Sequence, residues 1–213
     1  MRNEERRERL RTALIDAAER TIAESGLSAL KARDLAREVG CALGAIYTVF
    51  PDLDALILAV NLRTLALFDR AITAVRIEPE PDGAASPAQK DAAVETLVRL
   101  ALAYLHFAAG HPARWRALFQ HRVTHVLPDW YLVEQVRLFR YIEAPLRVLR
   151  PDLAEGQRAL LARSLFSATH GLVSLGLDEK LMVLSEPVLR GQIEIVVGAL
   201  GRGLALPAGS DGG

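Results

Sequence analysis

The side chains best suited to metal or acid–base chemistry in this 213-residue sequence are its five histidines and its single cysteine. His121 and His125 lie four residues apart, a spacing that places two ligands on one face of a helix. A zinc site would need a further ligand, and a metalloprotease helix would also carry a glutamate between the two histidines. The intervening residues are Arg122, Val123 and Thr124, so the motif is incomplete and we predict no metal site.

Other catalytic patterns are also missing from the sequence. Cys41 has no second cysteine with which to form an intramolecular disulfide. We interpret it as a small packing residue rather than a redox sensor. The sequence shows no glycine-rich phosphate loop, nucleophile elbow or carboxylate pair. We therefore predict that the chain is not an enzyme and that it uses no cofactor.

The composition indicates a soluble helical protein. Hydrophobic residues make up 51% of the chain and charged residues 24%, which permits a sizeable core and argues against disorder. Leu, Ala, Val and Arg dominate and favour helices over strands. The charged N-terminus is not a signal peptide, and no apolar run approaches the ~20 residues of a membrane helix. We expect a cytoplasmic protein that makes no contact with membranes.

The periodicity of apolar residues predicts an all-α fold, because these residues recur at three- and four-residue steps. Pro145 is expected to kink its helix or to end it near Ala144. Three prolines and a glycine between residues 78 and 90 indicate a loop. The expected helices cover residues 4–25, 32–39, 43–49, 53–76, 91–109, 113–126, 129–149, 154–175 and 186–205.

Three residues have the spacing of a helix-turn-helix. Ala36 is small enough to let two helices cross closely, and Gly40 can adopt the positive φ that the turn requires. Ile46 is placed to pack under the first helix of the pair, so the second helix would face outward, ready for a major groove. A tight helical hairpin that binds no DNA has the same spacing, so both interpretations remain open at this point.

A longer stretch resembles a known family. Residues 9–60 are similar to the N-terminal domain of TetR-type (TetR/AcrR) transcriptional regulators, through the run AREVGCALGAIYTVFPDLDALI from Ala36 to Ile57. The segment LIDAAERTIAESGLSALKARDLA matches the family's first helix. The resemblance implies a homodimeric repressor whose two N-terminal domains read a palindromic double-stranded DNA operator. It also implies that a small-molecule effector binds the C-terminal domain and releases the DNA.

The C-terminal half carries a weaker resemblance. HPARWRALF, from His111 to Phe119, and LFSATHGLVSLGL, from Leu165 to Leu177, resemble the family's His-Gly-containing (WHG) C-terminal subtype. Together the patterns predict a helix-turn-helix domain over residues 1–52 and a connecting helix over 53–77. A loop over 78–90, an effector-binding and dimerisation domain over 91–206 and a flexible tail over 207–213 would follow.

The DNA contacts must depend on where charges point, because the formal net charge of the chain is zero. Family resemblance places the Tyr47 hydroxyl at a phosphate, with Thr48 on the same exposed side. Lys31 and Arg33 lie at the start of the expected helix over residues 32–39, where backbone N–H groups and cations both favour binding of a phosphate. Small and apolar side chains would face the bases, where thymine methyl groups are read by apolar contact. The predicted DNA-contacting residues are Lys31, Arg33, Arg37, Leu43, Gly44, Ala45, Tyr47 and Thr48.

Two departures from the family pattern keep an alternative open. Many members have Ser or Thr as the cap of the recognition helix, where this chain has Ala42. Many also have a phosphate-binding Lys at the start of the fourth helix, where this chain has Leu53. The alternative is a dimeric helical ligand-binding or scaffold protein with a degenerate helix-turn-helix and no operator binding.

The C-terminal half is also where an effector and a second subunit are expected to bind. Its aromatic side chains predict a largely apolar effector held between helices. The apolar stripe of the last helix, interrupted by glycines, favours a homodimer through the last two helices. The predicted effector-binding residues are Phe107, Trp115, Phe119, Phe139 and His170.

Overall fold

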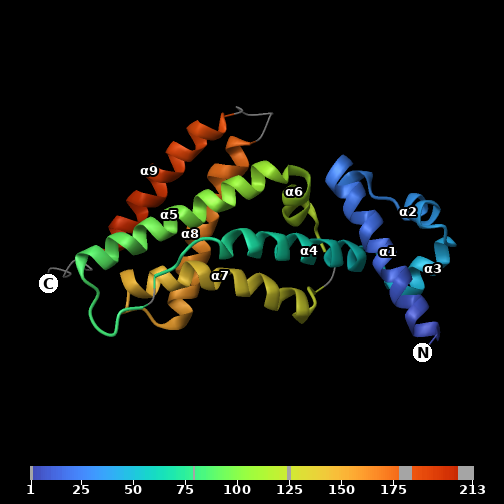
Figure 1. Ribbon diagram of the computed structural model, residues 1–213, viewed down its shortest axis with the longest axis horizontal. Coiled ribbons are helices and arrows are strands. Elements are labelled where there is room, and N and C mark those ends of the chain that lie inside the picture. Colours follow the sequence, from blue (N-terminus) through green and yellow to red (C-terminus); the bar gives the residue numbers. More distant parts are fainter. Residues whose placement is uncertain (1, 79, 124–125, 178–183, 206–213) are drawn as a thin grey trace. The chain divides into compact units, whose positions relative to one another are not determined.

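The computed structural model describes residues 2–78, 80–123, 126–177 and 184–205, and within these residues it contains nine α-helices and no strand. This confirms the predicted all-α fold (Figure 1). In chain order the elements are α1 (Arg2–Ser25), the 3-10 turn η1 (Leu27–Ala29), α2 (Ala32–Val39), α3 (Leu43–Val49), α4 (Leu53–Thr73), α5 (Pro87–Gly110), α6 (Pro112–Gln120), α7 (Asp129–Leu149), α8 (Glu155–Gly176) and α9 (Glu186–Ala205).

The chain divides into two compact units. The first unit comprises Met1–Phe68 together with Gly110–Glu134, and the second comprises Asp69–Ala109 together with Gln135–Gly213. The segment 110–134, which the sequence patterns placed with the effector-binding domain, therefore packs with the N-terminal helices. The predicted tail over 207–213 lies outside the described residues.

The turn between α2 and α3 follows directly from Gly40. This residue has φ 73° and ψ 36°, in the left-handed region that favours glycine. The Cys41 N–H donates to the Ala36 carbonyl at 2.9 Å, which satisfies one of the last carbonyls of α2. Both helices accordingly have the bounds expected from the sequence.

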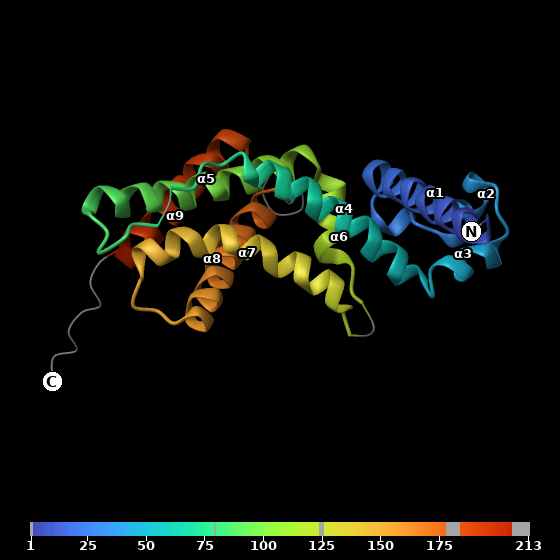
Figure 2. The same cartoon turned by 60° about the horizontal axis from the view of Figure 1, so that its bottom comes forward.

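The core of the first unit is formed by α1, α2, α3, α4 and one residue of α6. Leu14, Ile46 and Leu56 have no exposed surface, and Ala117 of α6 is 1% exposed in the same cluster. Because α6 contributes to this core, its packing on α1 is part of the stability of the DNA-binding fold. Figure 2 shows α1, α2 and α3 together in another view.

The core of the second unit is formed by α5, α7, α8 and α9. Leu105, Leu146, Val173 and Ile193 are each 1% exposed or less. Burial of Leu146 also explains why α7 continues to Leu149. The prediction that α7 could end near Ala144 is wrong, because packing of its last turns outweighs the cost of about 3 kcal/mol of Pro145 inside the helix.

Helix α5 begins four residues earlier than the expected residue 91, inside the predicted loop. Ser86 and Gln89 form a capping box: the Ser86 N–H donates to Gln89 Oε1 at 2.9 Å, and the Gln89 N–H donates to Ser86 Oγ at 3.3 Å. Pro87 occupies the first helical position, where its missing N–H is not needed. In the other direction, α4 ends at Thr73 and α6 ends at Gln120, both earlier than expected.

By length and composition, α5 is the one single helix in the described part of the chain that could cross a membrane. A little over half of its apolar window, 56%, is buried inside the protein. A core helix of this kind passes the same test, so α5 is weak evidence for a membrane span.

Candidate nucleic-acid interface and effector region

Helix α3 has one buried face and one open face. Ile46 and Val49 are 0% and 9% exposed, and they pack with Leu35 of α2 in the core of the first unit. On the other side Leu43 is 39% exposed and Tyr47 is 49% exposed. The short α2–α3 turn therefore presents a helix face that a DNA groove could receive.

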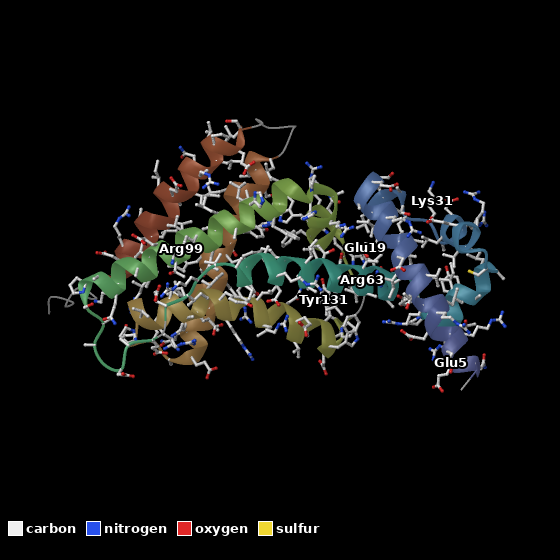
Figure 3. All side chains as sticks on the ribbon, viewed as in Figure 1. Glu5, Glu19, Lys31, Arg63, Arg99 and Tyr131 are labelled. Carbon is white, nitrogen blue, oxygen red and sulfur yellow. The ribbon has the colours of Figure 1, made fainter. Side chains whose placement is uncertain are left out.

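The cations predicted to meet phosphates all lie on the surface, but they differ in what they already bind. Lys31, labelled in Figure 3, is the N-cap of α2, and Arg33 lies in the first turn of this helix. Both side chains are exposed. Within the described residues neither has an ion-pair partner. Arg37, in contrast, donates from Nη2 to Asp34 Oδ1 at 2.7 Å.

The hydroxyl of Thr48 is engaged inside its own helix. Its Oγ1 donates to the Ala45 carbonyl at 2.7 Å, a common arrangement for threonine in a helix. Thr48 could accept a hydrogen bond at the DNA while this bond remains. It could donate to a phosphate only after breaking it.

The two departures from the family pattern have different structural outcomes. Ala42 is the N-cap of α3 and makes no side-chain cap. Leu53 is partly buried and packs against the core of the first unit, so it stabilises the start of α4. The start of α4 is also capped by Asp52, whose Oδ1 accepts the Ala55 N–H at 2.7 Å.

A cluster of charged side chains joins α1, α4 and α6 within the first unit. The Glu19 carboxylate accepts hydrogen bonds from Arg63 Nη1 and Arg114 Nη1, both at 2.9 Å. Figure 3 shows Glu19 of α1 and Arg63 of α4 directed toward each other. The pairs are separated by 44 and 95 residues, so no local sequence pattern could have indicated them.

His121 contacts a carboxylate of α4. Its Nε2 lies 2.9 Å from Asp54 Oδ1, and its side chain is 6% exposed. The other histidine of the pair, His125, lies outside the described residues. Among the residues that the structure describes, no group of three or more His, Cys, Asp or Glu side chains is arranged to hold a metal ion.

The five residues predicted to bind an effector are divided between the two units. Trp115 and Phe119 lie on α6 in the first unit, with ring centroids 5.7 Å apart. Phe107, Phe139 and His170 lie in the second unit, on α5, α7 and α8. That these five residues bind an effector stays a prediction.

In the second unit an aromatic cluster connects two of these residues. Phe166 stacks on His170 with centroids 5.8 Å apart, and it meets Phe139 edge-on at 5.6 Å. Tyr104 completes the cluster, because its hydroxyl lies 2.7 Å from His170 Nδ1. Sequence reasoning did not select Phe166 or Tyr104, although Phe166 precedes His170 by one helical turn.

Burial controls the charge of His170. It lowers the pKa of the imidazole below its ordinary value of 6.5, because burial disfavours the charged form. The ring is therefore neutral near pH 7. A neutral imidazole next to a tyrosine hydroxyl gives the aromatic cluster a polar group without a net charge.

Two family models match the sequence and together account for more than half of it. Residues 14–60 match the model described as bacterial regulatory proteins, tetR family. Residues 97–195 match the model described as tetracyclin repressor-like, C-terminal domain. The first match contains α2 and α3, and the second contains Phe107, Phe139 and His170.

Solved structures resemble the chain over nearly its whole length. A protein with unknown function from Rhodococcus sp. RHA1 is 22% identical, with a TM-score of 0.67, and the match covers 92% of this chain and 96% of that one. A TetR transcriptional regulator from the same organism is 17% identical, with a TM-score of 0.57 and coverage of 91% and 96%. The multidrug binding protein EbrR, solved with imidazole, is 20% identical, with a TM-score of 0.58 and coverage of 94% and 98%.

At these identities the likeness to solved structures establishes a shared fold. A comparison with curated proteins gives no match. The predicted absence of enzymatic activity agrees with the two regulator domains, whereas the His-Gly subtype stays a prediction. The chain is a member of the TetR family of DNA-binding transcription regulators, with the family's N-terminal helix-turn-helix domain and its C-terminal helical domain.

Proposed function

We propose that the chain is a homodimeric repressor that binds a palindromic operator through α2 and α3 and leaves it when a small, largely apolar effector binds. The observation that carries the proposal is the open face of α3, where Tyr47 and Leu43 are exposed while Ile46 on the opposite face is fully buried. The family of regulators to which the chain belongs supports the same assignment. The proposed place of action is the cytoplasm.

The proposed contacts divide into phosphate contacts and base contacts. Lys31 and Arg33, which have no ion-pair partner within the described residues, and the Tyr47 hydroxyl would hold phosphates. Arg37 and Thr48 would add contacts to the DNA backbone after giving up part of their present hydrogen bonding. The bases would meet Leu43, Gly44 and Ala45.

The base-facing residues offer no side-chain hydrogen bonds. Leu43 and Ala45 can contact thymine methyl groups, and Gly44 lets the backbone approach closely. The operator should therefore be recognised through methyl contacts and through the shape of the DNA. Replacement of thymines by uracils in the half-sites, which removes only the methyl groups, should weaken binding.

The proposal is tested by measuring binding to fragments of the promoter upstream of the protein's own coding sequence, by fluorescence anisotropy at several salt concentrations. Tyr47→Phe should weaken binding about tenfold, because it removes one hydrogen bond to a charged group. Arg33→Ala should reduce the slope of log K against log salt by about one. Arg140→Ala is the matched control, because this exposed arginine lies on α7 and not in the helix-turn-helix.

The result also separates the two functions considered from the sequence. If the parent binds its promoter and both variants bind as the parent does at every salt concentration, these contact assignments are wrong. If the parent binds neither its promoter nor any fragment selected from a random DNA library, the helix-turn-helix is degenerate. The chain would then be a helical ligand-binding or scaffold protein.

The proposed dimer would use α8 and α9. Large apolar side chains of these two helices are exposed to solvent in the single chain, which is typical of an interaction surface. Sedimentation velocity at micromolar concentration should give a dimer for the parent and a monomer for Ile195→Asp, while the neighbouring control Glu194→Gln should stay dimeric. A monomeric parent would contradict the proposal. The exposed residues are Leu160, Leu175, Val188, Ile195 and Leu200.

The effector is proposed to bind at the aromatic cluster of the second unit, at Phe139 and His170 together with Phe107. The likeness to EbrR, a multidrug binding protein, supports a small-molecule effector. Its signal would reach α3 through α4 and through α6, which packs on α1 in the first unit. Trp115 and Phe119 would then belong to this connection.

A further inference from the structure

A cavity of about 320 Å³ lies in the second unit, and no residue of the aromatic cluster lines it. Its walls are the chain that follows α4, the first turns of α5 and the last turns of α7. The volume is at the lower end of the range for small-molecule sites. None of the residues predicted to bind an effector lines it.

The walls of the cavity are held in place by contacts on several sides. The capping box of Ser86 and Gln89 fixes the start of α5. Arg99 of α5 donates to the Arg76 carbonyl at 3.3 Å, and Arg147 of α7 lies 3.2 Å from the Glu80 carboxylate. The chain after α4 is therefore tied to both helices, and the space between them exists before any ligand enters.

The inner surface of the cavity is apolar. Ile77, Ala92 and Val148 line it with hydrocarbon, and so does Pro145. Thr96 is 1% exposed, and its hydroxyl already donates to the Ala92 carbonyl at 2.8 Å. A ligand that fills this space would gain binding free energy from burial of apolar surface. It would find few free hydrogen-bonding groups near Thr96.

One charged residue lines this apolar space. Among the described residues that line the cavity, Glu78 is the charged one, and its side chain is 45% exposed. Its partner Arg76, at 3.0 Å, is 83% exposed. Surface pairs of this kind contribute little stability, so a ligand cation could replace Arg76 at the Glu78 carboxylate at small cost.

We propose that this cavity binds a small apolar amine, with the hydrocarbon body against Ile77, Ala92 and Val148 and the ammonium group at the Glu78 carboxylate. The site is independent of the effector region proposed above. Ile77 and Glu78 follow within five residues of the end of α4 at Thr73. A bound amine would therefore restrain the chain that leaves this helix.

The experiment uses three probes of similar size with the full-length, isotope-labelled protein. These are 2-phenylethylamine, neutral 2-phenylethanol and anionic 3-phenylpropionate, titrated while backbone amide NMR signals are recorded. The expected result is that the amides of Ile77, Glu78, Ala92 and Thr96 shift, and that the amine binds more tightly than the alcohol and the alcohol more tightly than the acid.

Four variants test the contributions of the Glu78 charge and of the cavity volume to binding. Glu78→Gln should weaken the amine roughly threefold to fivefold, to the level of the alcohol. Asp91→Asn removes an equal charge from exposed α5 surface that does not line the cavity, and it should change nothing. Ala92→Trp should fill the space and abolish binding of all three probes, and Val148→Phe serves the same purpose if circular dichroism shows that Ala92→Trp does not fold.

Several outcomes would overturn the proposal. These are equal affinities for the three probes, unchanged amine binding in Glu78→Gln, and no shift of the cavity amides at millimolar probe. Shifts confined to the amides of Phe166 and His170 would also overturn it, because they would place the amine at the aromatic cluster.

Discussion

Alanine at Gly40 should destabilise the protein through backbone conformation alone. Gly40 has φ 73°, and a Cβ atom built there would meet no atom within 4 Å. Steric clash with neighbours therefore contributes nothing, and the cost is that of a left-handed conformation for alanine, about 1–2 kcal/mol. The hydrogen bond from the Cys41 N–H to the Ala36 carbonyl requires the same turn, so the chain cannot relax without losing it.

Gly44 provides a control with the same chemical change. It lies in the first turn of α3, its φ is not positive, and a Cβ atom there would also meet nothing within 4 Å. Gly44→Ala should stabilise the helix by about 0.5–1 kcal/mol. The two alanine variants, four residues apart, should therefore differ by about 2 kcal/mol with opposite signs.

Urea unfolding followed by circular dichroism measures this difference, and Gly40→Asn adds a second check. Asparagine enters the left-handed region more easily than alanine, so Gly40→Asn should recover part of the lost free energy of unfolding. The reasoning is refuted if Gly40→Ala is as stable as the parent, or if both alanine variants shift the unfolding midpoint in the same direction.

The remaining predictions concern contacts inside each unit. Glu19→Gln should lower the melting temperature in calorimetry by several degrees, because the carboxylate holds two arginines at 19% exposure, whereas Arg20→Met, which removes an exposed pair, should change it little. Asp52→Ala should cost about 1 kcal/mol in urea unfolding by removing the cap of α4, and no change would contradict that cap. Since burial lowers the pKa of folded His170, the unfolded chain takes up the proton first. Stability present above pH 6.5 should therefore be lost as the pH falls below it, and His170→Gln should reduce this loss between pH 7.5 and 5.5.

The parts of the fold that local sequence determines could be predicted from it. Gly40 fixes the end of α2, and the alternation of buried and exposed positions around Ile46 fixes the orientation of α3. The early start of α5 was also present in the sequence, because Ser86 and Gln89 have capping-box spacing. The loop prediction relied on the prolines and the glycine of residues 78–90 and did not consider this capping-box spacing.

Contacts between distant segments could not be predicted in the same way. Glu19 and Arg114 are separated by 95 residues, and no periodicity relates them. The aromatic residues of the C-terminal half were selected by type alone, and type does not distinguish Trp115 of the first unit from Phe139 of the second. The predicted residues of the DNA interface lie together because α2 and α3 are adjacent in the chain.

Because α6 contributes to the core of the first unit, the N-terminal helices are not a self-contained module that can be joined to another C-terminal domain. Ala117 is 1% exposed in a cluster with residues of α1, α2, α3 and α4. A fragment ending at residue 77 would leave that patch of core uncovered and Glu19 without Arg114. A chimaera that joins this helix-turn-helix domain to another C-terminal domain should therefore include α6. Otherwise it needs a replacement helix with a small side chain at the position of Ala117 and an arginine that can pair with Glu19.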